Sequence, residues 1–411
     1  MRVKTGSNLP KVKRRNETSI LGMIYQQGAI TRREIAKQLD VTLPTVTTTV
    51  KKFLEEGILM ETEMQEQDCA LGRRANAVDI APQSRYVLGM EWGPFGVICC
   101  LSDLRGTIIQ KKKIACNMNE SSYEELLQVS ADLVHEILEM SELDAERVIG
   151  MGWTSPGMVD SEQGVLIRSS MSTVYWCKKP VKADLEHILH IPVCIENHVK
   201  VRAIGLDMFV RRERPEVYLY YFVQAGISCC VMVDGEPFGK AYYGTGDIGH
   251  TTVELDGPLC DCGKHGCLQT FCGETFVMNR VKQAMKEKKL PEVQLRCQNP
   301  EDLTMEMLLE AIKNRDKDVL ELLQPAIQYM GISISNIVNL LNSRLVVVDC
   351  ALLNDPVLQE DLTKIVKDNN YFKEELQLEM DYVIANRYTG ALGACALAVK
   401  ELFIERKTEE K

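Results

Sequence analysis

The sequence predicts an α/β protein that carries a small, mainly helical module at its N-terminus. After about residue 82, short apolar runs typical of strands alternate with amphipathic helical segments, which is the pattern of an α/β fold. Before that point, three short helical patterns are followed by two short strands. The chain has 411 residues, 45% of them hydrophobic and 26% charged, which suffices for about two to four domains with a sizeable core.

The composition excludes several classes of protein. The apolar content excludes disorder over the whole length. No run approaches the ~20 uncharged apolar residues that a membrane helix needs, and the basic N-terminus has no apolar stretch typical of a secretory signal. We therefore expect a cytoplasmic protein with no membrane partner. Most of the 15 cysteines are then expected to be reduced and buried.

The charge is unevenly distributed along the chain. Residues 1–54 contain 11 Lys and Arg and only 3 Asp and Glu, a net charge of +8, whereas the whole chain carries −10. A basic N-terminal part on an acidic body suggests a nucleic-acid-binding end. A solvated basic tail would give the same distribution, so the charge alone does not decide between the two.

The first two helices of the basic part have clear start and stop signals. Residues 17–27 place apolar side chains on one helical face, and Gly28 ends that pattern. Thr31 and Glu34 form a T-x-x-E capping box, which opens a short second helix. A turn at Asp40 and Val41 ends the second helix and leads to a third.

The third helix is expected to begin at a Thr42 cap and to end near Glu56, before Gly57. Its apolar side chains recur at helical spacing and bury one face: Val46, Val50, Phe53 and Leu54. The opposite face carries Pro44, Thr45, Thr47, Thr48, Lys51 and Lys52. Two helices joined by a tight turn, with Thr and Lys on the outer face of the second, are typical of a helix-turn-helix.

Two strands at 58–61 and 77–80 flank a polar loop and complete a winged helix-turn-helix. The loop contains Arg73 and Arg74, which could enter a minor groove. The candidate DNA-binding residues are Arg32, Thr42, Pro44, Thr45, Thr47, Thr48, Lys51, Arg73 and Arg74. Hydroxyl groups suit base edges or phosphates, and Lys51 and Lys52 suit phosphates. The alternative is a three-helix module that binds protein.

The body beyond the junction at 81–83 follows in order. Strands are expected at 86–91, 96–103, 107–113, 148–153, 191–196, 218–223, 228–234 and 345–348. Helices are expected at 121–140, 302–313, about 318–342 and 389–405. This order gives a mixed arrangement of strands and helices with no short-period repeat.

The most specific motif is Cys260-x-Cys262-Gly-x-x-Gly-Cys267, preceded by His250. Three thiolates and one imidazole form a tetrahedral zinc site, and the glycines allow the tight turns that bring the sulfurs together. Four protein ligands leave no position for water, so a structural zinc is expected. His265 is a competing ligand, but it lies inside the loop.

Several stretches together resemble the ROK family of repressors, open reading frames and sugar kinases. They are Gly150–Asp160, Gly244–His250, the CDCGKHGCL run at 260–268, and Gly390–Ala394. The resemblance spans roughly residues 84–405, and the winged helix in front matches the repressor branch. It implies an actin-like sugar-kinase fold of two α/β lobes with a sugar bound between them.

The resemblance also implies domain boundaries. The winged helix-turn-helix would occupy 1–82 and the ROK domain 83–411. The first lobe would span about 83–197 together with the C-terminal helix, and the second would span 198–385.

Four departures from the kinase motifs argue against an enzyme. The first phosphate loop, D-x-G-G-T-K in the kinases, is Glu91–Gly96 here, and the second, G-T-G-I-G-G, is Gln224–Cys229. The catalytic E-N-D becomes E-N-H, so His198 replaces the Asp that takes the proton from the sugar hydroxyl. Asp349 and Cys350 replace the Gly-Gly on the adenosine side. We expect no catalytic residue and no ATP-dependent phosphorylation.

The sugar side of the motif is better preserved. By resemblance, the sugar-binding residues are Pro156, Gly157, Asn197, His198, Asp247, His250 and Gln269. Asp247 and Gln269 each stand where the family has Glu, so the preferred sugar is expected to differ or to be a sugar phosphate. Trp153 could stack on a sugar face or pack in the core.

These observations predict a DNA-binding transcriptional regulator. The expected function is repression of carbohydrate-utilisation genes, with operator affinity changed by a sugar or sugar phosphate in a catalytically inactive cleft. Its partners would be double-stranded operator DNA, that effector, and a second copy in a homodimer or tetramer. One alternative is a repressor controlled by a protein partner, and another is an active sugar kinase.

Overall fold

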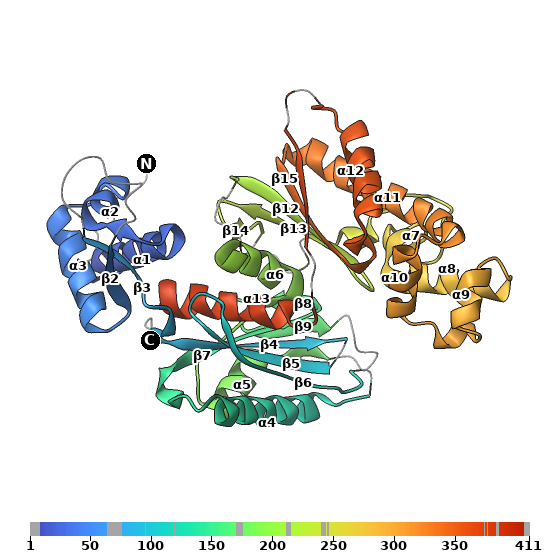
Figure 1. Cartoon of the computed structure of the whole chain (residues 1–411). Helices are drawn as coiled ribbons and strands as arrows, with labels where there is room; N and C mark the ends of the chain where they lie inside the picture. Colours follow the sequence, from blue (N-terminus) through green and yellow to red (C-terminus); the bar gives the residue numbers. More distant parts are fainter. Residues whose placement is uncertain are drawn as a thin grey trace. The chain divides into compact units, whose positions relative to one another are not determined.

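The computed structural model describes residues 9–63, 76–94, 96–118, 120–169, 176–210, 215–239, 244, 246–373, 375, 377–383 and 386–406. The chain divides into two compact units (Figure 1). Unit 1 comprises Met1–Glu213 and Arg387–Lys411, and unit 2 comprises Arg214–Asn386. The boundary between the lobes was expected at 197/198, whereas the two units divide at 213/214. The helix that begins at residue 198 stays with unit 1, because it packs against the C-terminal helix.

Unit 1 begins with a winged helix fold, and we call its described residues 9–80 the head. The head contains α1 (Leu9–Gln27), β1 (Ile30–Thr31), α2 (Arg32–Gln38), α3 (Leu43–Glu55), β2 (Leu59–Glu63) and β3 (Asn76–Ile80), with strand order β1-β3-β2. The Thr31–Glu34 capping box and the Thr42 cap are both present. Helix α1 begins earlier than the expected residue 17, because its basic first turns continue the helix.

The rest of unit 1, which we call lobe 1, is built on a five-stranded sheet of order β11-β7-β4-β5-β6. Its strands are β4 (Tyr86–Gly93), β5 (Gly96–Asp103), β6 (Ile108–Ile114), β7 (Val148–Ser155) and β11 (Val193–Asn197). Strands β4, β5 and β6 are antiparallel, while β7 and β11 run parallel to β4 and β7 respectively. The strands expected here are all present.

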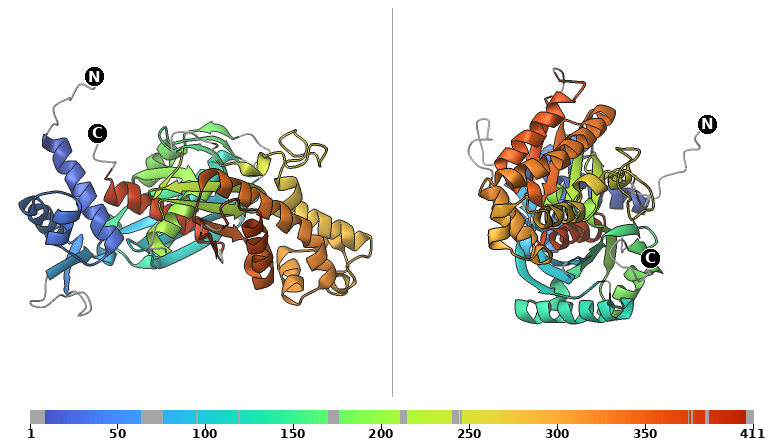
Figure 2. Two further views of the ribbon diagram at one scale, coloured as in Figure 1. Left: turned by 90° about the horizontal axis from the view of Figure 1, so that it is seen from above. Right: turned by 90° about the vertical axis from the view of Figure 1, so that its right-hand side faces the viewer.

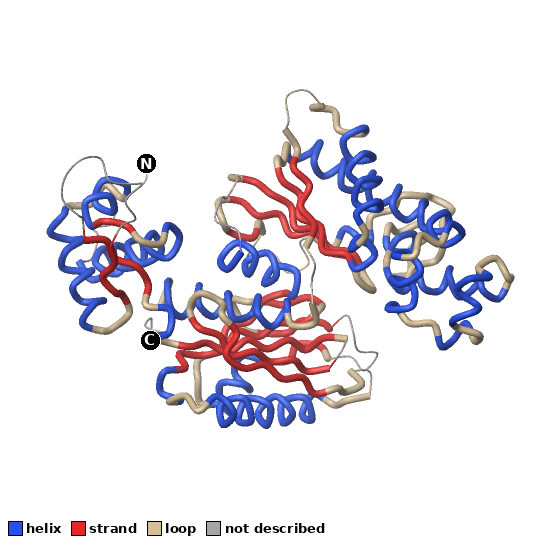
Figure 3. The backbone as a smooth tube through the Cα atoms, viewed as in Figure 1, coloured by secondary structure: helices blue, strands red, loops and turns tan. Residues whose placement is uncertain are grey.

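Helices cover both faces of the lobe 1 sheet (Figures 1 and 3). One face packs against α4 (Tyr123–Ser141) and α5 (Val181–Leu189), and the other packs against α13 (Thr389–Ala398). Gly152 of β7 faces the α13 backbone so closely that a Cβ there would collide with Ala394. Helix α13 also packs against α6 (His198–Gly205). A small sheet of β8 (Gly157–Asp160), β9 (Val165–Ser169) and β10 (Cys177–Lys179) completes the lobe.

Two helices of lobe 1 end in π-helical turns. Helix α6 continues as η4 (Leu206–Val210), and α13 continues as η8 (Val399–Ile404). The core of the head is continuous with part of the core of lobe 1, because Ile24 and Leu104 belong to the same buried cluster. The head is therefore packed on lobe 1 rather than linked to it by the chain alone.

Unit 2 is a five-stranded sheet of order β14-β13-β12-β15-β16, with helices around it (Figure 2). Its strands are β12 (Val217–Val223), β13 (Ile227–Val233), β14 (Glu236–Pro237), β15 (Leu345–Cys350) and β16 (Glu379–Tyr382). Its helices are α7 (Gln269–Cys272), α8 (Glu274–Lys286), α9 (Pro291–Arg296), α10 (Met305–Lys313), α11 (Lys317–Leu341) and α12 (Pro356–Asp368). Among the described helices of both units, none is long and apolar enough to cross a membrane.

Candidate functional site

Helix α3 presents the predicted polar surface of the head. Thr42, Pro44, Thr47, Thr48 and Lys51 are all exposed, while Val46, Val50 and Phe53 are buried in the head. The amphipathic pattern therefore orients the helix as the sequence predicts. The result is an exposed, hydroxyl-rich helix face.

Some of the hydroxyl groups on this face already have partners within the helix. The Thr42 side chain accepts from the Thr45 backbone N–H at 3.4 Å, and the two hydroxyls lie 2.8 Å apart. The Thr47 hydroxyl donates to the Leu43 carbonyl at 2.8 Å. These bonds fix the side-chain rotamers and leave lone pairs that can accept hydrogen bonds from an added ligand.

The basic residues of α2 and α3 differ in their ion pairs and their exposure. The Arg32 side chain, 23% exposed, pairs with Glu61 of β2 at 2.9 Å. Lys51 is 75% exposed and lies 3.7 Å from Glu55. Lys52, expected on the outer face, is only half-exposed: its side chain is 38% exposed and pairs at 3.0 Å with Glu17, whose side chain is 10% exposed. Arg73 and Arg74 lie outside the described residues.

The first turns of α1 add a second basic region to the head. Lys11, Lys13 and Arg15 are exposed there, while Arg14 donates to the backbone oxygen of Arg406. The helix therefore presents three cations in addition to those of α3. Such a surface can bind the phosphate groups of a nucleic acid.

The predicted metal ligands come together in unit 2. The ligand atoms of His250, Cys260, Cys262 and Cys267 all lie within 4.8 Å of one another. The Sγ atoms of Cys262 and Cys267 are 3.6 Å apart, and Cys260 Sγ is 3.6 Å from His250 Nδ1. Sulfur atoms bound to one tetrahedral zinc at ~2.3 Å would be separated by about 3.7 Å, so the spacing fits such an ion. His265 is not in this group and instead contacts the Gly257 carbonyl at 3.0 Å.

The loop around the cluster is held by backbone and side-chain contacts. Lys264 Nζ donates to the His250 carbonyl at 2.7 Å, and the Gln269 amide donates to Cys260 Sγ at 3.5 Å. Gly266 has a φ of +69°, and a Cβ there would collide with the Glu254 carbonyl. Only glycine therefore allows this close approach. The Gln269 contact supports the sulfur cluster directly.

The pKa values of two thiols in the cluster are shifted in opposite directions. A hydrogen bond from the Lys264 backbone lowers the pKa of Cys262, whereas burial raises the pKa of Cys267 to about 12. A divalent cation between the ligand atoms would favour the thiolate form of all three cysteines. The donor set and its spacing suit a structural metal ion.

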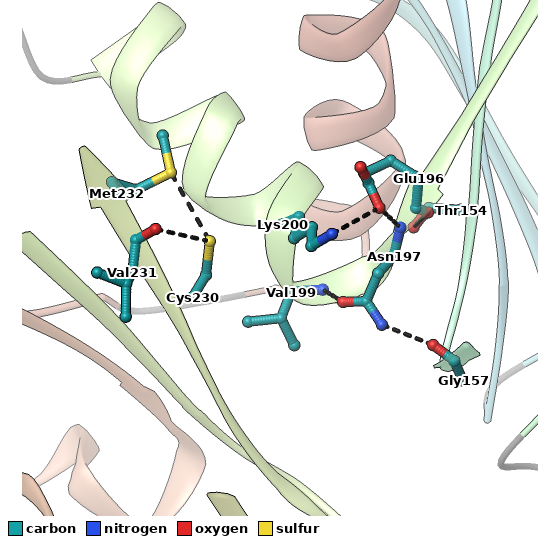
Figure 4. A network of polar contacts seen from close by, with 9 residues as sticks. All are labelled: Thr154, Gly157, Glu196, Asn197, Val199, Lys200, Cys230, Val231 and Met232. Atoms are coloured by element: carbon teal, nitrogen blue, oxygen red, sulfur yellow. Dashed lines mark hydrogen bonds and ion pairs between the residues drawn. The ribbon is translucent and has the colours of Figure 1, made fainter. Parts of the chain in front are cut away.

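Asn197, predicted to contact sugar, is at the centre of a polar network in lobe 1 (Figure 4). Its Oδ1 accepts from the Val199 N–H at 2.9 Å and so caps α6, while its Nδ2 donates to the Gly157 carbonyl at 2.8 Å. Glu196 accepts from the Asn197 backbone N–H at 2.7 Å and lies 3.5 Å from Lys200. Asn197 and Gly157 are thus brought together, and Asn197 retains one amide hydrogen beyond these contacts.

His198 follows Asn197 in the first turn of α6. The side chain is partly exposed, but burial of the ring and the nearby Arg202 lower the pKa of His198 to about 3. The imidazole is therefore neutral at physiological pH. A base with so low a pKa is poorly matched to removing a proton from a sugar hydroxyl.

Glu91, at the position of the kinase phosphate loop, is held in a buried ion pair. Its carboxylate lies 3.0 Å from the Arg202 guanidinium, and the two side chains are 5% and 6% exposed. Gly390 of α13 faces the pair so closely that a Cβ would collide with both groups. Sequence reasoning missed this pair. The signal available was two basic residues, Lys200 and Arg202, alternating with apolar ones in the run V-K-V-R-A-I.

Trp153 packs in the core and not against solvent. It is fully buried, and its ring lies 5.3 Å from that of Trp92 in an edge-to-face arrangement. Trp176 is 6.1 Å from Trp92 on another side. The core-packing alternative for Trp153 is therefore confirmed, and the sugar-stacking alternative is wrong. The three tryptophans of the chain form one cluster in lobe 1.

In unit 2, the loop before His250 places Asp247 on the surface. Its carboxylate accepts from the Ser228 hydroxyl at 3.3 Å. Asp349 ends β15 and accepts from the Tyr220 hydroxyl at 2.7 Å. Burial and Asp349 raise the pKa of Glu274 to about 7. Asp349 is therefore close enough to Glu274 for the two carboxyl groups to influence each other.

Comparison with known proteins agrees with this geometry. A family model described as ROK family matches residues 87–401, and one described as MarR family matches residues 14–63. The chain is 21% identical over 392 residues to the xylose repressor of Caldicellulosiruptor bescii, covering 95% of this chain and 97% of the relative. It is 22% identical over 342 residues to the DNA-binding transcriptional dual regulator NagC of Escherichia coli (strain K12), covering 83% and 81%.

One solved structure covers nearly the whole fold. It is described as a ROK family transcriptional regulator, homolog of the Escherichia coli MLC protein. Its TM-score is 0.79 at 19% identity, covering 96% of this chain and 97% of that one. The likeness therefore includes the head, lobe 1 and unit 2.

Proposed function

This chain belongs to the ROK family, and from that premise we propose that it is a cytoplasmic transcriptional repressor of carbohydrate-utilisation genes. In this proposal the head binds operator DNA, and a sugar or sugar phosphate bound by the ROK domain changes the operator affinity. The observation that carries the proposal is the exposed Thr and Lys face of α3, on a winged helix packed against the ROK fold.

The DNA-binding residues follow from this surface. We assign base and phosphate contacts to Arg32, Thr42, Pro44, Thr45, Thr47, Thr48 and Lys51. Arg73 and Arg74, which lie outside the described residues, are assigned from the sequence alone. The basic first turns of α1 would add contacts to phosphate. Because one head reads only one half-site, we propose that the protein acts as a homodimer or tetramer on a two-fold-related operator.

The sugar site is proposed on the family motif, and the geometry around Asn197 supports the part of it in lobe 1. Pro156, Gly157, Asn197 and His198 belong to lobe 1, while Asp247, His250 and Gln269 belong to unit 2. The Asn197 network supports this assignment, because a capped amide fixed on both sides is a preorganised partner for a hydroxyl. The sugars named for the relatives, xylose and N-acetylglucosamine, are the first effectors to test.

The proposal includes no phosphoryl transfer. The neutral His198 and the Glu91–Arg202 ion pair both replace groups that a kinase needs near phosphate. The paired Glu91 has its charge compensated by protein, so it has little capacity left to hold a magnesium ion. We expect no ADP production above background with ATP, magnesium and glucose, mannose, N-acetylglucosamine or allose.

We further propose that the His250, Cys260, Cys262 and Cys267 group holds a structural zinc ion. Four protein ligands fill a tetrahedral shell, so zinc would order the loop and would not activate water. The contact from Gln269 to Cys260 would then link the metal loop to α7.

The experiment that tests the function is fluorescence anisotropy with two DNA duplexes at one stated salt concentration. One duplex comes from upstream of the protein's own gene, and the other has the same composition in shuffled order. We expect binding to the first to be tighter by about 10³-fold. The double variant T47A/T48A should lose most of this preference while retaining weak binding to both duplexes. Equal affinity of the wild type for both duplexes would contradict sequence-specific recognition of this DNA.

A further inference from the structure

The turn between β5 and β6 in lobe 1 contacts two elements of the head. The Arg105 guanidinium lies 2.6 Å from the Asp79 carboxylate in β3 and donates to the Tyr25 carbonyl in α1. It also stacks over the Tyr25 ring, 4.5 Å from the centroid. In return, the Tyr25 hydroxyl donates to the Leu104 carbonyl at 2.6 Å. The turn and the head are thus joined by contacts in both directions.

These contacts fix the position of the head on the turn more than they add to the free energy of unfolding. Tyr25 is 2% exposed, whereas the side chains of Arg105 and Asp79 are 27% and 24% exposed. An ion pair at that exposure contributes little net free energy, but a planar guanidinium with three simultaneous contacts has one orientation. Asp103 fixes the turn itself, because its carboxylate accepts from the backbone N–H groups of Arg105 and Thr107 at 2.9 and 2.8 Å.

The other side of the turn contacts the helix that begins at Asn197. Gly106 has a φ of +84°, and a Cβ there would lie 2.5 Å from the ring of Phe209. Only glycine therefore lets the ring pack directly against the turn. Phe209 belongs to η4, which continues α6, and Asn197 caps the first turn of α6. One helical segment thus connects the Asn197 network with the turn that holds the head.

We infer that Arg105 and Phe209 are positioning residues that set the orientation of the head on lobe 1. A displacement of α6 at Asn197 would move Phe209, and Phe209 would move the turn that carries Arg105. This inference rests on the proposed function for its consequence, because a change in head orientation alters how two heads match two half-sites. It identifies the side of lobe 1 through which the state of the sugar site reaches the DNA.

Hydrogen exchange of the full-length protein tests the mechanical part of the inference without DNA or effector. The variants are R105A, F209A and the double variant R105A/F209A. We expect F209A to speed exchange of head peptides containing Tyr25 and Asp79 by roughly fivefold. The double variant should exchange no faster than R105A alone, because both changes interrupt the same connection. Unchanged head exchange in F209A, or additive effects in the double variant, would overturn the inference.

Two further variants separate positioning from general damage. R147A is the matched control, because Arg147 also stacks over a tyrosine, Tyr86, and donates to a carbonyl, that of Gln83, but contacts no helix of the head. It should leave head exchange unchanged. F209L retains apolar volume and should restore part of the protection if the packing on Gly106 matters. If F209A speeds exchange throughout lobe 1 and F209L restores protection there as fully as in the head, Phe209 has a purely structural role. That result would overturn the inference.

DNA binding supplies the functional readout. In the anisotropy assay, R105A and F209A should weaken binding to the upstream duplex by roughly tenfold and leave the weak binding to shuffled DNA unchanged. Equal loss on both duplexes would overturn the inference, because it would show a damaged head. If the wild type bound neither duplex, the proposed function would fail, while the exchange experiment would still decide whether Phe209 positions the head.

Discussion

Lys51 and Lys52 are adjacent in sequence but lie in different surroundings. The Lys51 side chain is 75% exposed on the outer face of α3. Lys52 is 38% exposed and pairs at 3.0 Å with Glu17 of α1, whose side chain is only 10% exposed. Because successive residues of a helix point about 100° apart, one lysine can serve DNA while its neighbour joins two helices.

Substitution of each lysine by alanine should therefore affect a different property, DNA binding for Lys51 and stability for Lys52. K51A should weaken DNA binding with a shallower salt dependence, while its free energy of unfolding changes by less than about 0.5 kcal/mol. K52A should lower the free energy of unfolding by roughly 1–2 kcal/mol, because it leaves the Glu17 carboxylate buried without its cation. Urea unfolding and anisotropy at several salt concentrations measure both effects. Similar stability losses in the two variants would contradict this assignment.

Glu274 is the residue whose proton should make unit 2 sensitive to pH. Burial and the neighbouring Asp349 raise the pKa of Glu274 from 4.5 to about 7. The folded protein therefore holds this proton more tightly than the unfolded chain does. The resulting stability is fully present below about pH 4.5 and is lost as the pH rises to about 7.

Comparison with E274Q isolates this contribution. The glutamine has a similar shape and no proton to lose, so wild type should become less stable relative to E274Q by about 2–3 kcal/mol between pH 4.5 and 7.5. Thermal unfolding at both pH values measures the difference. E292Q, at an exposed position of α9, is the control and should follow wild type. Parallel pH dependence of wild type and E274Q would contradict the account.

At the scale of single residues, the sequence predicted what local patterns determine. The capping residues Thr31, Glu34 and Thr42 act through neighbours three positions away, so their roles could be read from spacing. The positions of Lys52 and Trp153 depend on α1 and on the tryptophan cluster, which the local sequence does not contain. Such tertiary partners are the reason why the local sequence could not decide either position.

At the scale of elements, the metal loop is the clearest example of a site that sequence spacing defines. The motif places three sulfurs in one tight loop, and the structure brings the ligand atom of the predicted His250 within 4.8 Å of them. The loop packs beside α7 through Gln269. If zinc holds the loop, its removal should disorder the loop before the sheet of unit 2 unfolds.

The metal prediction can be checked by analysis and by substitution. The purified protein should contain about one zinc per chain by inductively coupled plasma mass spectrometry, and C260S should contain much less. Chelation should lower the midpoint of thermal unfolding and speed hydrogen exchange in residues 250–268. C297S is the matched control, because Cys297 is buried in unit 2 outside the cluster. A stoichiometry near zero in undisturbed protein, or equal loss in C297S, would contradict the assignment.

The elements themselves were predicted unevenly. Long apolar strands such as β4 and β5 and the amphipathic α4 have strong periodicity, and their bounds agree with the sequence to within a few residues. Helix α6 and the strands β8, β9 and β10 were missed, because they are short and carry no complete period. Helix α6 matters for function, since it carries the Asn197 cap, His198 and Arg202.

At the scale of the whole molecule, the structure joins a winged helix head to a ROK domain. The head is anchored at a second place by the C-terminal helix. Arg406, just after η8, stacks over Phe53 with its guanidinium 4.9 Å from the ring and lies 3.4 Å from Glu56. Both Phe53 and Glu56 belong to the C-terminal end of α3. The head is therefore tied to the rest of unit 1 at two separate points, through Arg105 and through Arg406.

This second anchor predicts that R406A weakens operator binding without changing α3 itself. The expected loss is roughly three- to tenfold for the upstream duplex, because the variant loosens the head but leaves the DNA-facing side chains in place. Binding to shuffled DNA should be unchanged. If R406A lost equal affinity for both duplexes in the anisotropy assay, that result would contradict a role of Arg406 in orienting the head.

The most direct test of the central claim is the response of DNA affinity to sugar. The wild-type protein would be bound to the upstream duplex, and xylose, N-acetylglucosamine, glucose and their phosphates would be added in turn while anisotropy is recorded. We predict that at least one of them changes the dissociation constant by about tenfold or more. The tryptophan cluster of lobe 1 should report binding of the same compound by intrinsic fluorescence. DNA affinity that is unchanged by every compound would contradict control by a sugar.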